Sequence, residues 1–119
     1  MTDIVHKHTG INYAKAAPKS SLELGDAEAA AVQKTVNRVT LASLEAKIQY
    51  EDFMCPTRHP HMTICILTLT NGYVMVGKST PADPLNFDAA LGRKFAREDA
   101  VRQIWPLEAY LLREKMTKE

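Results

Sequence analysis

The sequence contains no long hydrophobic run. Its longest apolar stretch lies around residues 64–69, whereas about 20 consecutive apolar residues are needed to cross a bilayer. The first ten residues, MTDIVHKHTG, lack the apolar core of a secretory signal. These two absences predict a cytoplasmic protein without a membrane span.

Cysteine is equally scarce, because the chain has only Cys55 and Cys65. Two cysteines do not make the dense disulfide framework of a small secreted domain, so reduced thiols are expected. Together with His59 and His61 they form the pattern C-x3-H-x-H-x3-C. These residue types bind zinc, but the spacing fits no standard finger and Cys65 falls in an apolar strand. The sequence therefore favours a loop with a buried thiol over a zinc site, and it predicts no metal and no other cofactor.

A charge excess and a catalytic signature are also missing. Fifteen Lys and Arg oppose fourteen Asp and Glu, for a net charge of +1, whereas a protein that coats duplex DNA usually has a basic excess. No nucleophile can be grouped with a base and an orienting residue, since Ser79 has no histidine near it in sequence. We therefore expect a non-enzymatic protein without catalytic residues.

The remaining pattern indicates one small α+β domain. Residues 1–25 carry turn-forming residues without a clear period and predict a flexible arm, and residues 26–119 predict a single domain. Asp26 is expected to cap a short alanine-rich helix, and Thr40 a clearer one. The apolar stripe of this second helix consists of Leu41, Leu44 and Ile48. Residues 54–61 should form a loop, because two prolines there disfavour helix.

A β-hairpin is predicted by two β-branched runs, residues 63–70 and 73–79, on either side of Asn71-Gly72. This dipeptide favours a type I′ turn, because both of its residues tolerate positive φ. A type I′ turn fixes the facing residues on the two strands. The expected pairs are Leu69 with Val74, Leu67 with Val76 and Cys65 with Lys78.

A long helix should follow, from a cap at Asn86 to Trp105, with Pro106 opening a second helix. A row of small residues at helical spacing would let another element approach closely. The row consists of Gly92, Ala96 and Ala100, and the buried face is widened by Leu91, Phe95 and Ile104. The expected architecture is a β-hairpin packed by three to four helices. Because a two-stranded ribbon is marginally stable, a homodimer could pair the hairpins or bury the small-residue row.

Candidate binding residues lie on the long helix and at its end. Arg93, Lys94 and Arg97 form a basic edge with no evident structural role, which is either a solvated surface or a site for an anion or an acidic partner. Glu98 is placed to pair with Arg102. The other candidates are a carboxylate inside the apolar face, which needs a structural or ligand partner, and a cluster at the helix break that either closes the core or anchors an interface. They are Asp99, Trp105, Glu108 and Tyr110.

Residues 39–114 resemble a family of small proteins of tailed bacteriophages and prophages, of the gene-49/gene-66 type. The resemblance rests on short motifs at fixed offsets, with departures at Ala109 and at Thr80-Pro81. The motifs are Asn71-Gly72, Gly77-Lys78-Ser79, Asn86-Phe87-Asp88, Gly92-Arg93-Lys94, Ala96-Arg97-Glu98 and the run from Ile104 to Tyr110. The resemblance implies a phage accessory protein that acts in the cytoplasm of the infected bacterium.

Three kinds of function remain open. The first is a protein that binds a host macromolecule, most simply a host protein, and modulates it, for example in counter-defence. The second is a small nucleic-acid-associated regulator that uses the basic edge. The third is a protein that sequesters a small anionic ligand.

Overall fold

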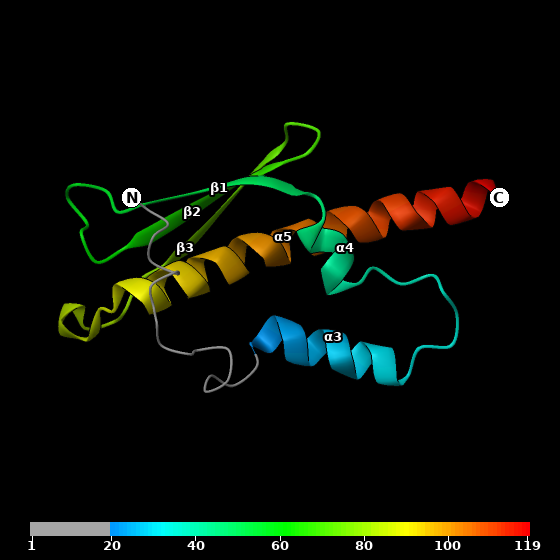
Figure 1. Ribbon diagram of the computed structural model, residues 1–119, viewed down its shortest axis with the longest axis horizontal. Coiled ribbons are helices and arrows are strands. Elements are labelled where there is room, and N and C mark those ends of the chain that lie inside the picture. The colour runs from blue at the N-terminus through cyan, green and yellow to red at the C-terminus, as the bar shows by residue number, and fades with distance from the viewer. Residues whose placement is uncertain (1–19) are drawn as a thin grey trace.

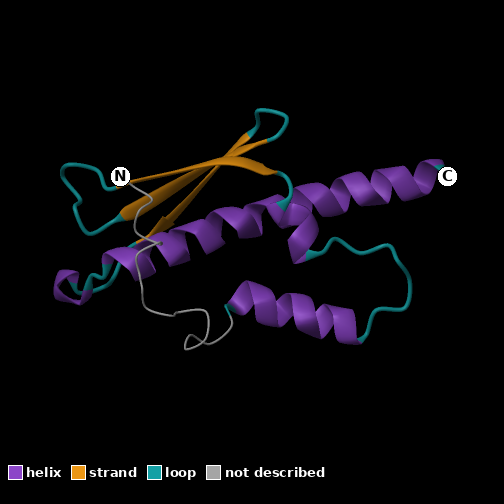
Figure 2. Ribbon diagram, in the orientation of Figure 1, coloured by secondary structure: helices purple, strands orange, loops and turns teal. Residues whose placement is uncertain are grey.

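The computed structural model describes residues 20–119, and the first 19 residues of the predicted arm lie outside the described part. The fold is a three-stranded antiparallel sheet in the order β1-β2-β3, with one long helix, α5, along one face (Figures 1 and 2). Two shorter helices, α3 and α4, precede the sheet. The predicted α+β class is confirmed, although the sheet has one strand more than expected.

Helix α3 spans Ser21–Ala31 and begins five residues before the predicted cap. Ser20 is the true cap: its hydroxyl accepts from the amide of Glu23, whose carboxylate accepts from the amide of Ser20. This capping box satisfies two amides that the helix itself leaves unbonded. The predicted cap, Asp26, lies inside the helix, and its carboxylate accepts hydrogen bonds from Arg38 and from the Leu41 amide.

Helix α4, Leu41–Glu45, has the predicted cap, since the Thr40 hydroxyl accepts from the Ser43 amide at 3.0 Å. The helix then ends after five residues, and Ile48–Met54 forms strand β1, where the sequence suggested a continuing helix. This strand was not predicted because its apolar residues, Ile48, Tyr50, Phe53 and Met54, do not alternate regularly with polar ones. The strand forms because its backbone pairs with β2, and this long-range pairing cannot be read from the local sequence.

The hairpin of β2, Thr63–Leu69, and β3, Val74–Ser79, is confirmed, but its turn and register differ from the prediction. In the turn, Gly72 has positive φ, 90°, and Asn71 does not. Its amide donates to the Leu69 carbonyl and the Leu69 amide donates to the Tyr73 carbonyl, both at 2.8 Å. These bonds make a three-residue loop, with a turn followed by a glycine bulge, in place of the two-residue type I′ turn.

One extra loop residue shifts every strand pair by one position. The observed pairs are Leu67 with Met75 and Cys65 with Gly77. These four residues are buried under α5, whereas Val74 and Val76, which were expected to face the core, lie on the opposite and exposed face.

Helix α5 runs without interruption over Ala89–Lys118, so the predicted break at Pro106 is wrong. Its cap is Asp88, whose carboxylate accepts from the Leu91 amide at 2.9 Å. The predicted cap, Asn86, ends a preceding 3-10 turn, Pro84–Asn86. At 1.5 Å per residue the 30-residue helix is roughly 45 Å long. Its second half extends beyond the sheet (Figure 1).

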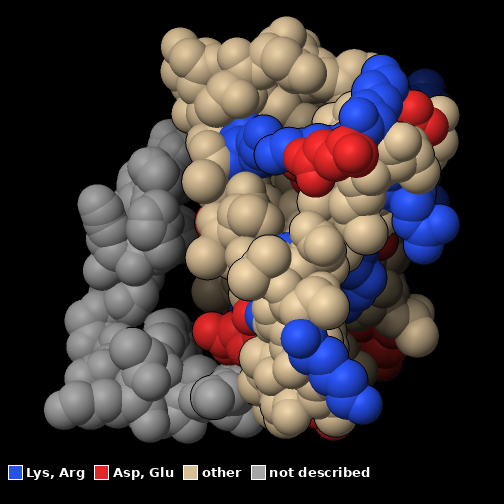
Figure 3. Space-filling model, turned by 90° about the vertical axis from the view of Figure 1, so that its right-hand side faces the viewer, with Lys and Arg blue, Asp and Glu red and all other residues tan. Residues whose placement is uncertain are grey.

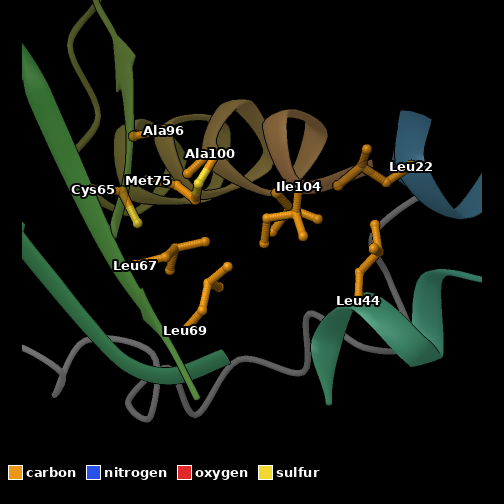
Figure 4. Close-up of a cluster of buried hydrophobic side chains, with 10 residues drawn as sticks. Leu22, Leu44, Cys65, Leu67, Leu69, Met75, Ala96, Ala100 and Ile104 are labelled. Carbon is orange, nitrogen blue, oxygen red and sulfur yellow. The ribbon is translucent and has the colours of Figure 1, made fainter. Parts of the chain in front are cut away.

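The core lies between the sheet and α5 and is continued by Leu22 of α3 and Leu44 of α4 (Figure 4). The predicted small-residue row is buried there, against β2 and β3. A Cβ added to Gly77 would lie 2.9 Å from the Ala100 Cα and closer still to the backbone of Ala96. The row is therefore used inside one chain and is not available to join two chains. Leu91 and Phe95, expected in the buried face, are about half exposed.

Candidate functional site

Two adjoining hollows lie between the second half of α5 and the segment from α3 to α4. The first, of about 320 Å³, has a largely apolar lining with two arginines at its rim. It is lined by Ala29, Asn37, Arg38, Val39, Trp105, Ala109, Leu112, Arg113 and Met116. The second, of about 330 Å³, shares Arg38, Val39 and Leu112 with the first. We call the two together the α5 groove.

One wall of the α5 groove is a helical stripe. Trp105, Ala109, Leu112 and Met116 follow one another at spacings of four, three and four residues, which places them on one side of a helix. Trp105 also packs against the core and so anchors the stripe to the folded domain. The stripe exists only because α5 continues past Pro106.

The opposite wall is the linker between α3 and α4, and it is held by one carboxylate. Asp26 Oδ1 accepts from Arg38 Nη1 at 2.8 Å and from the Leu41 amide at 3.0 Å. The hydrogen bond from Arg38, followed by that from Leu41, lowers the pKa of Asp26. Arg38 Nε also donates to Gln33 Oε1 at 2.7 Å. These bonds fix the linker at both ends, so the wall is built into the fold.

The rim of the α5 groove carries four cationic residues, two of which already face a carboxylate of the same chain. Its charged residues are Arg38, Lys47, Arg113, Lys115 and one carboxylate, Glu108, which lies 3.8 Å from Lys47 Nζ. Figure 3 views this end of the molecule and shows scattered Lys and Arg side chains with acidic side chains among them, on a surface that is mostly uncharged. An apolar floor with a cationic rim is suited to a surface that presents apolar and acidic groups.

The aromatic cluster predicted at the end of the long helix is divided between two surfaces. Trp105 and Glu108 line the α5 groove. Tyr110 does not line the groove and is 65% exposed, although its neighbour Leu111 does line the second hollow.

The predicted basic edge is largely neutralised within the chain, and Arg97 has the structural role that the sequence did not reveal. Its guanidinium donates to both oxygens of Glu45, at 2.6 and 2.9 Å, and from Nε to Glu51 at 2.8 Å. The hydrogen bond from Arg97 lowers the pKa of Glu45. Arg97 therefore joins α5 to both α4 and β1.

The other members of the edge have weaker ties. Lys94 Nζ pairs with Glu98 at 2.9 Å, so Glu98 does not pair with Arg102 as predicted. Arg102 instead donates to Ser21 Oγ at 3.0 Å. Arg93 is partly buried, and its Nε has no hydrogen-bond partner among the described residues.

Asp99 makes the structural bond to the hairpin that was one of its two expected roles. Its Oδ2 accepts from the Lys78 amide at 3.0 Å, and Gln103 Nε2 donates to the Val76 carbonyl at 2.7 Å. Both backbone groups belong to the edge of β3 that faces away from β2. Side chains of α5 therefore occupy this edge, as natural proteins often arrange for exposed sheet edges.

A metal site is not assembled by the loop before β2. Cys65 is buried in the core, whereas Cys55 is exposed, and the His61 ring packs edge-on against Phe87 at 5.2 Å between centroids. Among the described residues, no three His, Cys, Asp or Glu side chains are grouped so that they could hold a metal ion.

Residues 72–79 have the spacing G-x4-G-K-S, which is that of a phosphate-binding loop. Such a loop wraps its backbone amides around the phosphates and leads into a helix. Here Gly72 sits in the hairpin turn, and Gly77 and Lys78 lie within the extended strand β3, whose next element is the short turn at residues 84–86. The spacing therefore does not create a phosphate site in this fold.

The sequence did not indicate several residues of the α5 groove, among them Arg38, Ala109, Leu112 and Met116. The helical spacing from Trp105 to Met116 was the available signal. This spacing did not lead to a predicted stripe, because Pro106 was expected to end the helix. Within residues 20–119, no helix is both long enough and apolar enough to span a membrane.

Comparison with known proteins gives one match. The model of the family described as "Phage protein (N4 Gp49/phage Sf6 gene 66) family" matches residues 27–116, which include every residue that lines the α5 groove. Neither the curated proteins nor the solved structures provide a further match. The match covers most of the chain and agrees with the resemblance drawn from its motifs. The chain belongs to this phage protein family.

Proposed function

We propose that this phage protein is a non-enzymatic accessory protein that binds a host protein in the cytoplasm of the infected bacterium and modulates it, with counter-defence as one form of this role. The observation that carries the proposal is the α5 groove, an apolar hollow with a cationic rim. Trp105 lies in one wall of the groove, and tryptophan and arginine are among the residues most often found at the energetic centre of protein interfaces.

The chemistry of the groove defines the partner surface. Its apolar lining favours apolar side chains, and Arg113 and Lys115 on its rim favour carboxylates. The other two rim cations, Arg38 and Lys47, already face carboxylates of the same chain. The basic edge of α5 offers less support for nucleic acid, because Arg97 and Lys94 are paired with carboxylates of the same chain.

The test is capture of host proteins from a lysate by three immobilised forms of the protein: wild type, Arg113→Glu and Leu85→Glu. Arg113→Glu reverses a charge on the groove rim. Leu85 is 92% exposed and lies in the 3-10 turn before α5, so Leu85→Glu is a control that adds a carboxylate away from the groove. We expect wild type and the control to retain one common host protein and Arg113→Glu to lose it.

Equal capture by all three folded forms would exclude the α5 groove as the binding surface. Nuclease treatment of the lysate tests the alternative function of a nucleic-acid-associated regulator. Capture that disappears when the nucleic acid is digested would support this alternative. Ultraviolet absorbance of a co-purified nucleotide would support the sequestering reading.

A further inference from the structure

The sheet has a second exposed surface, on the face that points away from α5. No helix of the described part covers this face (Figure 2). Tyr50, Met54, Val74 and Val76 lie on it and are each about half exposed or more, and Ile64 and Ile66 lie between them. A contiguous apolar surface of this kind is uncommon on a protein that works alone. We call it the open sheet face.

The strand register arranges the open sheet face in three rows across the strands. The rows, from β1 to β3, are Tyr50–Thr68–Val74, Asp52–Ile66–Val76 and Met54–Ile64–Lys78. Its two charges, Asp52 and Lys78, stand on opposite outer strands in neighbouring rows. Apolar or neutral side chains fill the other positions.

We propose that the open sheet face binds a second copy of this chain, so that two sheets pack face to face as a symmetric dimer. Sheets that pack in this way keep their strands nearly aligned, about 10 Å apart. The interface of a two-fold dimer must complement itself, because the same surface is contributed twice. The positions of the two charges select one arrangement.

A two-fold axis parallel to the strands places β1 of one copy opposite β3 of the other, row by row. Asp52 then faces Val76 of the second copy, one row from Lys78 of that copy, and the symmetry produces the pair twice. An axis perpendicular to the strands would place Asp52 opposite Asp52 of the second copy, which is a like-charge contact. The first arrangement is therefore favoured.

Two other routes to a dimer are closed by the structure. The row of Gly92, Ala96 and Ala100 is buried under the sheet of the same chain. The edge of β3 is occupied by Asp99 and Gln103. The dimer proposal does not depend on the α5 groove, because the open sheet face lies on the other side of the sheet.

The experiment is sedimentation analysis of the full chain from micromolar to sub-millimolar concentrations, with wild type, Val76→Glu and the control Leu85→Glu. Wild type and the control should form a dimer, and Val76→Glu should weaken it roughly tenfold or more by placing a carboxylate in an apolar interface. A wild type that stays monomeric throughout, or an unchanged dimer with Val76→Glu, would overturn the proposal.

A charge exchange tests the arrangement directly. Asp52→Lys alone and Lys78→Asp alone should each weaken the dimer, since each puts like charges one row apart. The double variant Asp52→Lys/Lys78→Asp should restore it. These substitutions change only exposed side chains, and the Lys78 amide that Asp99 binds is retained. A double variant no better than the single ones would overturn the proposed alignment of the strands.

Discussion

Arg97 and Glu45 are 52 positions apart in the chain and form a two-bond guanidinium–carboxylate pair, with distances of 2.6 and 2.9 Å. The same guanidinium also binds Glu51. This single side chain therefore connects the long helix to the last turn of α4 and to the middle of β1. It explains how β1 can place a glutamate on the side of the sheet that faces the helix.

Removal of this connection should destabilise the fold. We expect Arg97→Ala to lower the free energy of unfolding by roughly 1–3 kcal/mol, because it leaves two partly buried carboxylates side by side without their cation. Arg97→Lys keeps the charge but cannot bond both glutamates in the same way, so it should restore only part of the loss. Denaturant unfolding of the three proteins measures the effect, and an Arg97→Ala protein as stable as wild type would contradict it.

The same pair should make stability depend on pH. Arg97 holds the pKa of Glu45 below its ordinary value of 4.5, so the stabilisation is fully present above that value and is lost as the pH falls through the lowered pKa. Wild type should therefore lose stability over the pH interval below 4.5. Glu45→Gln should be less stable at neutral pH and should show a smaller loss over this interval. Parallel curves for the two proteins would refute the assignment.

Gly77 should not accept even one methyl group. A Cβ there would overlap the backbone of α5 at Ala96 and Ala100, and a helix backbone cannot move aside as a side chain can. Gly77→Ala should therefore cost roughly 1–3 kcal/mol or more. The matched control is Gly25→Ala, which meets nothing within 4 Å. The control should be unchanged or more stable by up to about 1 kcal/mol, because alanine favours helix over glycine.

Pro106 should lower the stability of the protein, and replacing it should raise that stability. It lies inside α5 and has no amide to bond the carbonyl four residues earlier. Its side chain is exposed, so Pro106→Ala should lose little packing and gain one helical hydrogen bond. We expect the free energy of unfolding to rise by roughly 1–3 kcal/mol, measured by denaturant unfolding. A fall in stability would show that the proline ring contributes to folding in another way.

The two thiols should react at very different rates. Cys55 is exposed, whereas Cys65 is buried in the core and its burial raises its pKa to about 12. Because the thiolate is the reactive form, iodoacetamide should modify Cys55 in the folded protein and Cys65 only after unfolding. Peptide mass spectrometry measures both sites. Modification of Cys65 at the rate of Cys55 in native buffer would contradict the burial.

The sequence was sufficient for elements whose cause is local. The hairpin, the helix caps at Thr40 and the small-residue row follow from short motifs, and all three are present. The register was not predictable from Asn71-Gly72 alone, because the dipeptide fits both a two-residue and a three-residue loop. Which loop forms depends on whether Met75 or Val76 faces the helix.

Elements that depend on contacts between residues far apart in the sequence were not predicted. Strand β1 lacks a regular alternation of apolar and polar residues and is stabilised by pairing with β2 and by Arg97. The α5 groove was found only at Trp105 and Glu108, because its opposite wall depends on the bond between Asp26 and Arg38, 12 positions apart. The local effect of Pro106 on a helix was overestimated, since tertiary packing carries α5 through it.

The occupied edge of β3 limits how copies of this chain can polymerise. Growth of a continuous sheet through many molecules requires two free strand edges in every molecule, one to accept a neighbour and one to offer to the next. Asp99 and Gln103 already bond backbone groups on one of these edges. Edge pairing through β1 would therefore stop after two molecules, so the chain should not seed an open-ended fibril by this route, even at high concentration.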